Sequence, residues 1–299
     1  MERRNFIKTS ALTAGLLTLS YKDLLAMVKD PAYKINMLTN EIGTFTEKGG
    51  TIVFLLTKDG AVIVDAQFPE QAGHLIDELK KRSEKPFQLL INTHHHGDHT
   101  SGNIAFKGLV PHVVAHANSL VNQTRVATEQ KSLDKQLFPD QTFTDSWRTK
   151  VGHEKIRAYY FGPGHTNGDA IIHFEHGNVA HMGDLMFNRR YAYIDKSAGA
   201  NIHNWIIALD KALNTFDNKT QFVFGHAFDP VKINGNKDDL KAMQNYLSKL
   251  LDFVGGEIKA GKTKEEILLA KSIPGVAEWQ GDGIERGLTA AYIELTTNQ

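Results

Sequence analysis

The stretch His94-His95-His96-Gly97-Asp98-His99 decides the fold, and it follows a predicted strand at residues 87–91. Side chains two positions apart in an extended segment project to the same side of the chain. His94 and His96 can therefore bind one metal ion, whereas His95 points the other way and is not expected to be a ligand of that ion.

The second half of this stretch offers ligands for a second point. Gly97 lets the chain turn, so that Asp98 and His99 can face a position close to the first two histidines. Imidazole and carboxylate groups suit zinc, and the absence of a thiolate leaves iron and manganese open. The alternative for this motif by itself is a surface histidine cluster.

Three further pieces of sequence weaken that alternative. The turn Gly162-Pro163-Gly164 leaves His165 exposed between two predicted strands, and Gly183-Asp184 and Gly225-His226 each end a predicted strand. Sheets of α/β proteins place their sites at strand ends. We therefore expect His165, Asp184 and His226 to lie at the edge of the sheet that carries the 94–99 motif.

Predicted strands and helices alternate along the chain, which indicates a layered α/β domain. Residues 35–65 are predicted to form strands, with Lys58-Asp59-Gly60 as a hairpin turn. The tail is predicted to be helical, with Thr263-Lys264-Glu265-Glu266 as a capping box. The other predicted elements are strands at 87–91, 113–115, 156–161, 170–174, 178–182 and 221–224, and helices from Pro69 and at 117–137, 202–216, 239–254 and 284–295.

The N-terminal segment 1–26 is predicted to be an export signal rather than part of the fold. Arg3-Arg4 precede a mildly apolar run at 11–19, which resembles a twin-arginine signal and is too short for a stable membrane anchor. We therefore expect a periplasmic or secreted protein. The alternative is an amphipathic N-terminal helix that stays on the protein.

Composition excludes several classes of function. Lys+Arg and Asp+Glu both number 34, so the formal net charge of zero gives no reason to expect nucleic acid as a partner. The chain has no cysteine, which excludes disulfides, thiolate catalysis and zinc–thiolate clusters. A small-molecule substrate is expected.

The H-x-H-x-D-H motif at 94–99, followed by His165, Asp184 and His226, resembles the metallo-β-lactamase superfamily. The resemblance implies a four-layer αββα sandwich over residues 35–230, with residues 231–299 as a helical C-terminal extension. It also implies a dinuclear site. One metal would be bound by His94, His96 and His165, and the other by Asp98, His99 and His226. Asp184 would bridge the two metals, and Asp65 would support the metal loop.

The resemblance further implies a hydrolase. Two Zn²⁺ ions, or iron or manganese, would share a hydroxide that attacks a carbonyl or ester bond, with Asp98 and Asp184 as catalytic residues. We expect the substrate to be a small lactone or ester. A periplasmic β-lactamase is the second candidate, since true zinc β-lactamases lack an aspartate at the position of Asp184. A non-catalytic exported metal-binding protein is the alternative from another class.

The segment after Asp184 contains the candidate substrate residues Arg189, Tyr191 and Tyr193. An arginine can bind a carboxylate and a tyrosine can stabilise an oxyanion. The alternative is a surface loop whose long side chains lie along the protein surface. The sequence leaves open the oligomeric state and the purpose of the helical tail, which could cap the site or form a dimer.

Overall fold

The computed structural model describes residues 32–297, and the residues from Ile35 onward form one unit. The predicted export signal lies outside the described residues, so export stays a prediction. Within residues 32–297, no helix combines the length and the apolar character that crossing a bilayer requires.

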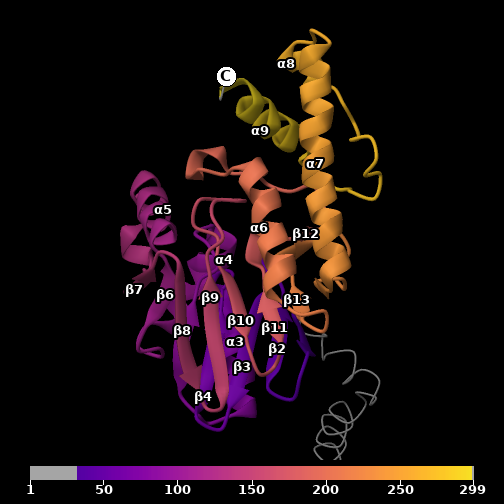
Figure 1. Cartoon of the computed structure of the whole chain (residues 1–299). Helices are drawn as coiled ribbons and strands as arrows, with labels where there is room; N and C mark the ends of the chain where they lie inside the picture. Colours follow the sequence, from indigo (N-terminus) through magenta and orange to yellow (C-terminus); the bar gives the residue numbers. More distant parts are fainter. Residues whose placement is uncertain (1–31, 298–299) are drawn as a thin grey trace, which may run out of the picture. The chain divides into compact units, whose positions relative to one another are not determined.

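Two mixed β-sheets form the centre of the fold (Figure 1). The strands of the first sheet, in spatial order, are β1 Lys34–Met37, β2 Ile42–Thr46, β3 Ile52–Thr57, β4 Gly60–Val64, β5 Phe87–Ile91, β6 Val113–His116 and β7 Gln141–Phe143. Those of the second are β15 Asn234–Gly235, β13 Gln221–Val223, β11 Val179–His181, β10 Ile171–Phe174, β9 Glu154–Tyr159 and β8 Ser146–Val151. The parallel pairs β4–β5, β5–β6 and β11–β13 end at the edge that carries the histidines.

Alternation along the strands builds the core between the sheets. Val53 and Leu55 of β3 and Val62 of β4 are fully buried there with Ile172 and Phe174 of β10. The intervening residues of β3 and β4 are buried as well, because the outer face of the sheet is also covered. This explains why the sequences of these strands are continuous apolar runs.

Helices cover the outer faces. The α3 helix, Pro69–Arg82, connects the parallel strands β4 and β5, and α5, Ala117–Glu129, packs on β6 and β7. On the second sheet, Trp205 of α6 (Ile202–Thr215) shares a second core with Phe222 and Phe224. This arrangement confirms the predicted α/β sandwich.

The C-terminal helices α7 (Lys237–Lys259), α8 (Lys264–Leu268) and α9 (Ile284–Thr297) belong to that second core. The α7 helix packs along α6 and α9 packs on α7, as Figure 1 shows in orange and yellow. The predicted capping box at Thr263 is confirmed: its side chain accepts from the N–H of Glu266. A second capping box at Asn236 starts α7 two residues before the predicted boundary.

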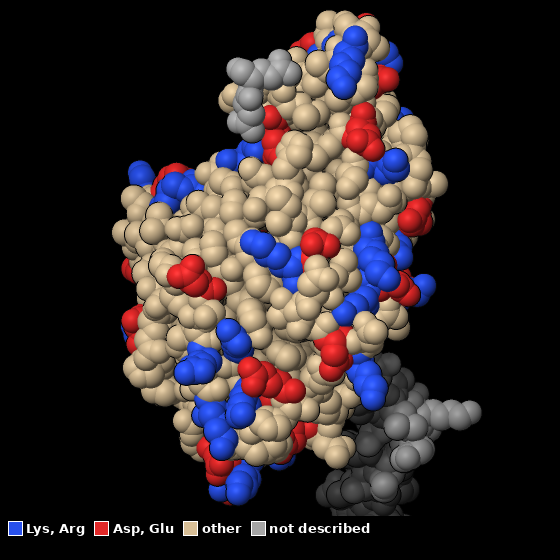
Figure 2. Space-filling view, viewed as in Figure 1, with Lys and Arg blue, Asp and Glu red and all other residues tan. Residues whose placement is uncertain are grey.

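Charged residues are distributed without a one-sided excess on the face shown in Figure 2, where basic and acidic side chains are interspersed. This distribution agrees with the formal net charge of zero.

Candidate metal centre

Loops at one edge of the sandwich bring the predicted ligands together. The α4 turn, Gly97–Thr100, follows β5, the η3 turn, Gly183–Leu185, follows β11, and β14, His226–Ala227, follows β13. His165 lies in the loop between β9 and β10. Residues from four separate segments thus meet within one small volume. Among residues 32–297, three groups of side chains could hold a metal ion, and two of them contain all seven predicted residues.

Three imidazoles form the first group. His96 Nδ1 lies 3.1 Å from His94 Nε2 and 2.8 Å from His165 Nε2. Tetrahedral ligands of zinc, at about 2.0–2.1 Å from the metal, lie roughly 3.3 Å from one another. The spacing of these three nitrogens therefore suits one metal ion.

Hydrogen bonds on the far side of each ring assign its tautomer. His165 Nδ1 donates to the carbonyl oxygen of Tyr193 at 2.7 Å, and His94 Nδ1 donates to Thr93 Oγ1 at 3.0 Å. His96 donates from Nε2 to Asp195 Oδ2 at 2.9 Å. The three facing nitrogens therefore carry lone pairs with no proton between them, and a bound cation removes the resulting repulsion.

The second group lies beside the first. His226 Nε2 is 3.1 Å from Asp98 Oδ2, and His99 Nε2 is 3.8 Å from the same oxygen. His226 is further held by the parallel pairing of β14 with β12 (Phe187–Asn188) and by stacking of its ring on Phe187.

Asp184 stands between the two groups. Its Oδ2 is 3.4 Å from His165 Nε2 and 3.4 Å from His226 Nε2, while its Oδ1 is 3.1 Å from His99 Nε2. The Oδ1 atom of Asp184 and the Nε2 atom of His99 are buried, yet neither is aligned for a hydrogen bond with any described residue. Buried polar atoms without partners are costly, so this pair fits metal coordination.

A buried carboxylate supports the loop from behind, where the family resemblance places it. Asp65 Oδ2 accepts from His99 Nδ1 at 2.7 Å and from the hydroxyl of Thr93 at 2.7 Å. Asp65 has a positive φ of 67°, which is unusual for a residue with a side chain. His181 lies behind Asp65, at 3.5 Å from the same oxygen, rather than in the site.

Asp195 is a functional residue that the sequence did not indicate. Besides accepting from His96, its Oδ1 accepts from the N–H of Ala198, which fixes the carboxylate. Asp195 Oδ2 also lies 3.6 Å from His95 Nε2, and His95 belongs to neither of the two groups that contain the seven predicted ligands. Asp195 thereby holds His96 in the tautomer that leaves Nδ1 free.

The two groups differ in their affinity for protons. Burial lowers the pKa of His94 well below its usual value and that of His165 to about 3, so both rings are neutral. Burial also opposes the charged forms of His99 and His226, but nearby carboxylates, Asp184 foremost, outweigh it. The pKa of His99 is raised well above its usual value and that of His226 to about 9.

Zinc binding is therefore expected to release protons from His99 and His226 of the second group rather than from His94 and His165 of the first. Below about pH 9 the metal must displace a proton from His226, and the raised pKa of His99 acts in the same direction, so the metal affinity of this group falls as the pH falls. Calorimetric titration at pH 7.5 in two buffers of different ionisation enthalpy should show more proton release in one binding step than in the other. Equal proton release in both steps would contradict this assignment.

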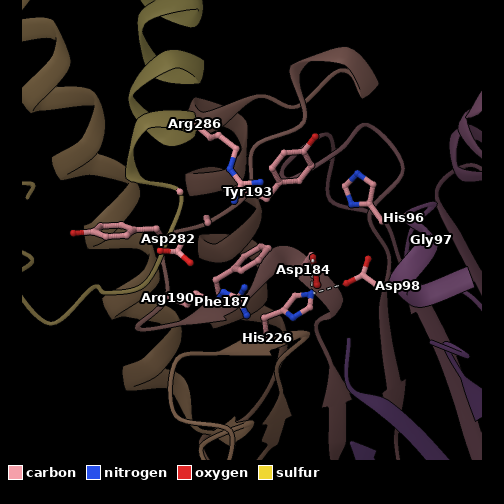
Figure 3. Close-up of a pocket in the computed structure, with 13 residues that line it drawn as sticks. His96, Gly97, Asp98, Asp184, Phe187, Arg190, Tyr193, His226, Asp282 and Arg286 are labelled. Atoms are coloured by element: carbon pink, nitrogen blue, oxygen red, sulfur yellow. Dashed lines mark ion pairs between the residues drawn. The ribbon is translucent and has the colours of Figure 1, made fainter. Parts of the chain in front are cut away.

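The metal ligands open into a cavity of about 320 Å³ (Figure 3). Of the predicted substrate residues, Tyr191 and Tyr193 line it. Arg189 is not among the lining residues: its guanidinium lies 5.0 Å above the ring of Trp279 and 3.6 Å from Asp239. Tyr193 also has a structural role, since its carbonyl orients His165.

The fold and this cluster define a metallo-hydrolase. The sequence model of the metallo-beta-lactamase superfamily matches residues 46–246, a span that contains all seven predicted ligands. The chain therefore belongs to the metallo-β-lactamase superfamily.

Relatives and solved structures of the family differ in activity. A probable hydroxyacylglutathione hydrolase from Schizosaccharomyces pombe is 27% identical over 215 residues, which are 69% of this chain and 75% of the relative. The metallo-beta-lactamase IND-1 of Chryseobacterium indologenes is 25% identical over 228 residues, 74% of this chain and 90% of that protein.

Two solved structures show the same fold. A metallo-beta-lactamase from Pontibacter korlensis aligns with a TM-score of 0.62 and 20% identity over 72% of this chain and 99% of its own. A double mutant of the sec-alkyl sulfatase PisA1 aligns with a TM-score of 0.69 and 14% identity, over 88% of this chain and 50% of its own. The latter coverage extends the likeness in fold into the C-terminal helices.

Proposed function

We propose that this protein is a dinuclear metal-dependent hydrolase of small lactones or esters. The observation that carries the proposal is the position of Asp184, whose Oδ2 lies 3.4 Å from a nitrogen of each group, His165 in one and His226 in the other. A carboxylate placed in this way is suited to bridge two cations. Zinc is the favoured metal, with iron or manganese as alternatives.

Metal ions held by these residues would supply hydroxide near neutral pH and polarise the bond that is cleaved. The protein residues do the rest. Burial opposes ionisation of Asp98, but neighbouring His99 lowers the pKa of its carboxyl to about 2, so it remains an acceptor. Since Asp98 lines the cavity, it can orient the attacking group by accepting a hydrogen bond from it.

A β-lactamase is the second candidate, because relatives such as IND-1 carry that name. Asp184 at the bridging position disfavours it. The zero net charge supports a small molecule over a nucleic acid as substrate. The twin-arginine-like segment supports a periplasmic or secreted location.

Metal analysis combined with a hydrolysis screen tests the proposal. We expect about two zinc ions per chain and turnover of a lactone or aryl ester that stops when a chelator removes the metal. Thioesters, β-lactams and phosphodiesters serve as comparison substrates. One tightly held ion and no turnover of any substrate would instead favour the non-catalytic metal-binding protein.

A further inference from the structure

Two arginines line the cavity on the side away from His96 and Asp98, and the sequence pattern singled out neither. Arg190 follows β12 in the chain, and Arg286 lies in the first turn of α9. In Figure 3, Arg286 reaches down beside Tyr193, and Arg190 lies near Phe187 and His226. The wall is thus built jointly by the segment after Asp184 and by the C-terminal extension.

Backbone hydrogen bonds fasten these two segments together. Tyr191 donates its N–H to the carbonyl of Gln280 at 3.1 Å, and Gln280 donates to the carbonyl of Arg189 at 3.0 Å. Arg190 and Gln280 form an isolated parallel bridge. Arg189, which has a positive φ of 56°, packs on Trp279, whereas the next residue, Arg190, lines the cavity.

Arg286 is also held in place. Its guanidinium carbon lies 5.5 Å from the centre of the Tyr193 ring, in a cation–π arrangement. Gly283, with a φ of +105°, leaves the space that the guanidinium occupies, since a Cβ there would lie 3.0 Å from Nη2 of Arg286. Glycine at 283 thus suits both the positive φ and the close approach of the guanidinium.

Neither arginine is neutralised by the protein. Among the ion pairs of residues 32–297, none involves Arg190 or Arg286, whereas Arg189 pairs with Asp239. Asp282 lines the same cavity but is not within ion-pair distance of either guanidinium. Guanidinium groups bind carboxylates, sulfates and phosphates through paired hydrogen bonds, which makes this wall suited to an oxyanion.

We propose that Arg190 and Arg286 bind an anionic group of the substrate, a carboxylate, sulfate or phosphate separate from the bond that is cleaved. This inference rests on the proposed function and narrows its substrate class to anionic esters or lactones. It also assigns a purpose to the C-terminal extension, which supplies Arg286 and the Gln280 contact that positions Arg190.

Replacement by methionine tests the proposal, because methionine keeps much of the side-chain length and removes the charge. Arg190→Met and Arg286→Met are compared on an aryl ester that carries a carboxylate and on its neutral carboxamide. We expect KM for the carboxylate ester to rise about 10- to 100-fold, with kcat and both constants for the carboxamide nearly unchanged. Arg189→Met, in the same segment but packed on Trp279, is the matched control and should leave the KM ratio of the two esters unchanged.

Binding of benzoate to the zinc-loaded protein gives a readout that does not need turnover. The dissociation constant should rise in Arg190→Met and Arg286→Met but stay constant in Arg189→Met. The inference is overturned if KM rises equally for the carboxylate ester and its carboxamide, or if KM and benzoate affinity are unchanged in both variants. The proposed function stands in either case. If the protein cleaves no ester but still binds benzoate in a way that depends on the two arginines, the proposed function is overturned and the inference of an anion-binding site stands.

Discussion

Asp184→Asn is expected to leave the protein with less than one metal ion per chain and to lower kcat/KM by more than about 100-fold. This effect exceeds the loss of activity expected when a residue that only hydrogen-bonds to a metal ligand is replaced. Among residues 32–297, Asp184 is the one carboxylate within 3.4 Å of nitrogens in both groups. Asparagine has the same shape but no charge, so it cannot offset two cations. Zinc content and hydrolysis rate, measured on the same preparation, check the prediction.

Asp282→Asn is the matched control, since this aspartate lines the same cavity but belongs to none of the metal-ligand groups. It should retain the full zinc content. Far-ultraviolet circular dichroism shows whether Asp184→Asn keeps the fold. A folded Asp184→Asn protein that still binds two zinc ions would rule out the bridging role.

The sequence allowed the candidate metal ligands to be selected because their signals are local. His94, His96, Asp98 and His99 stand in one short motif, and the other ligands follow glycine turns or strand ends. The rule that strand ends meet at one sheet edge is sufficient to bring such residues together. The structure places all seven in two adjoining groups.

Asp195 could not be found in this way. It lies 99 positions after His96 in the chain, outside any motif, and becomes its hydrogen-bond partner only through tertiary packing. The choice between Arg189 and Arg190 also depends on tertiary structure. Arg189 adopts a positive φ of 56°, and the bridge to Gln280 then determines which of the two faces the cavity.

Element prediction failed, among other places, at an edge strand with no fully buried residue and at the end of a helix that contains glycine. The strand β8, Ser146–Val151, alternates between exposed and partly buried residues at the edge of its sheet, and its pairing with β9 maintains it. The α7 helix continues through Gly255 and Gly256 to Lys259, past the predicted end at 254. Its long buried face, from Leu240 to Val254, outweighs the low helix propensity of the two glycines.

Gly225→Ala is expected to disturb the metal centre although residue 225 binds no metal. A Cβ at this position would lie 2.8 Å from the backbone carbon and oxygen of Gly183 and would overlap Oδ1 of Asp184. The backbone cannot move aside easily, because the Gly225 N–H donates to the carbonyl of Gly183 at 2.8 Å and its carbonyl accepts from the N–H of Thr51 at 2.9 Å. The Asp184 side chain must therefore shift.

We expect Gly225→Ala to lose at least one metal ion and most of its activity, and to lose about 1–3 kcal/mol of stability through overpacking. Gly256→Ala in α7 is the control, because its Cβ would meet nothing within 4 Å. Alanine there should raise helix stability by up to about 1 kcal/mol and leave the zinc content unchanged. Thermal unfolding and zinc analysis of both variants test this prediction. Full zinc occupancy and normal turnover in Gly225→Ala would mean that Asp184 does not need its observed position.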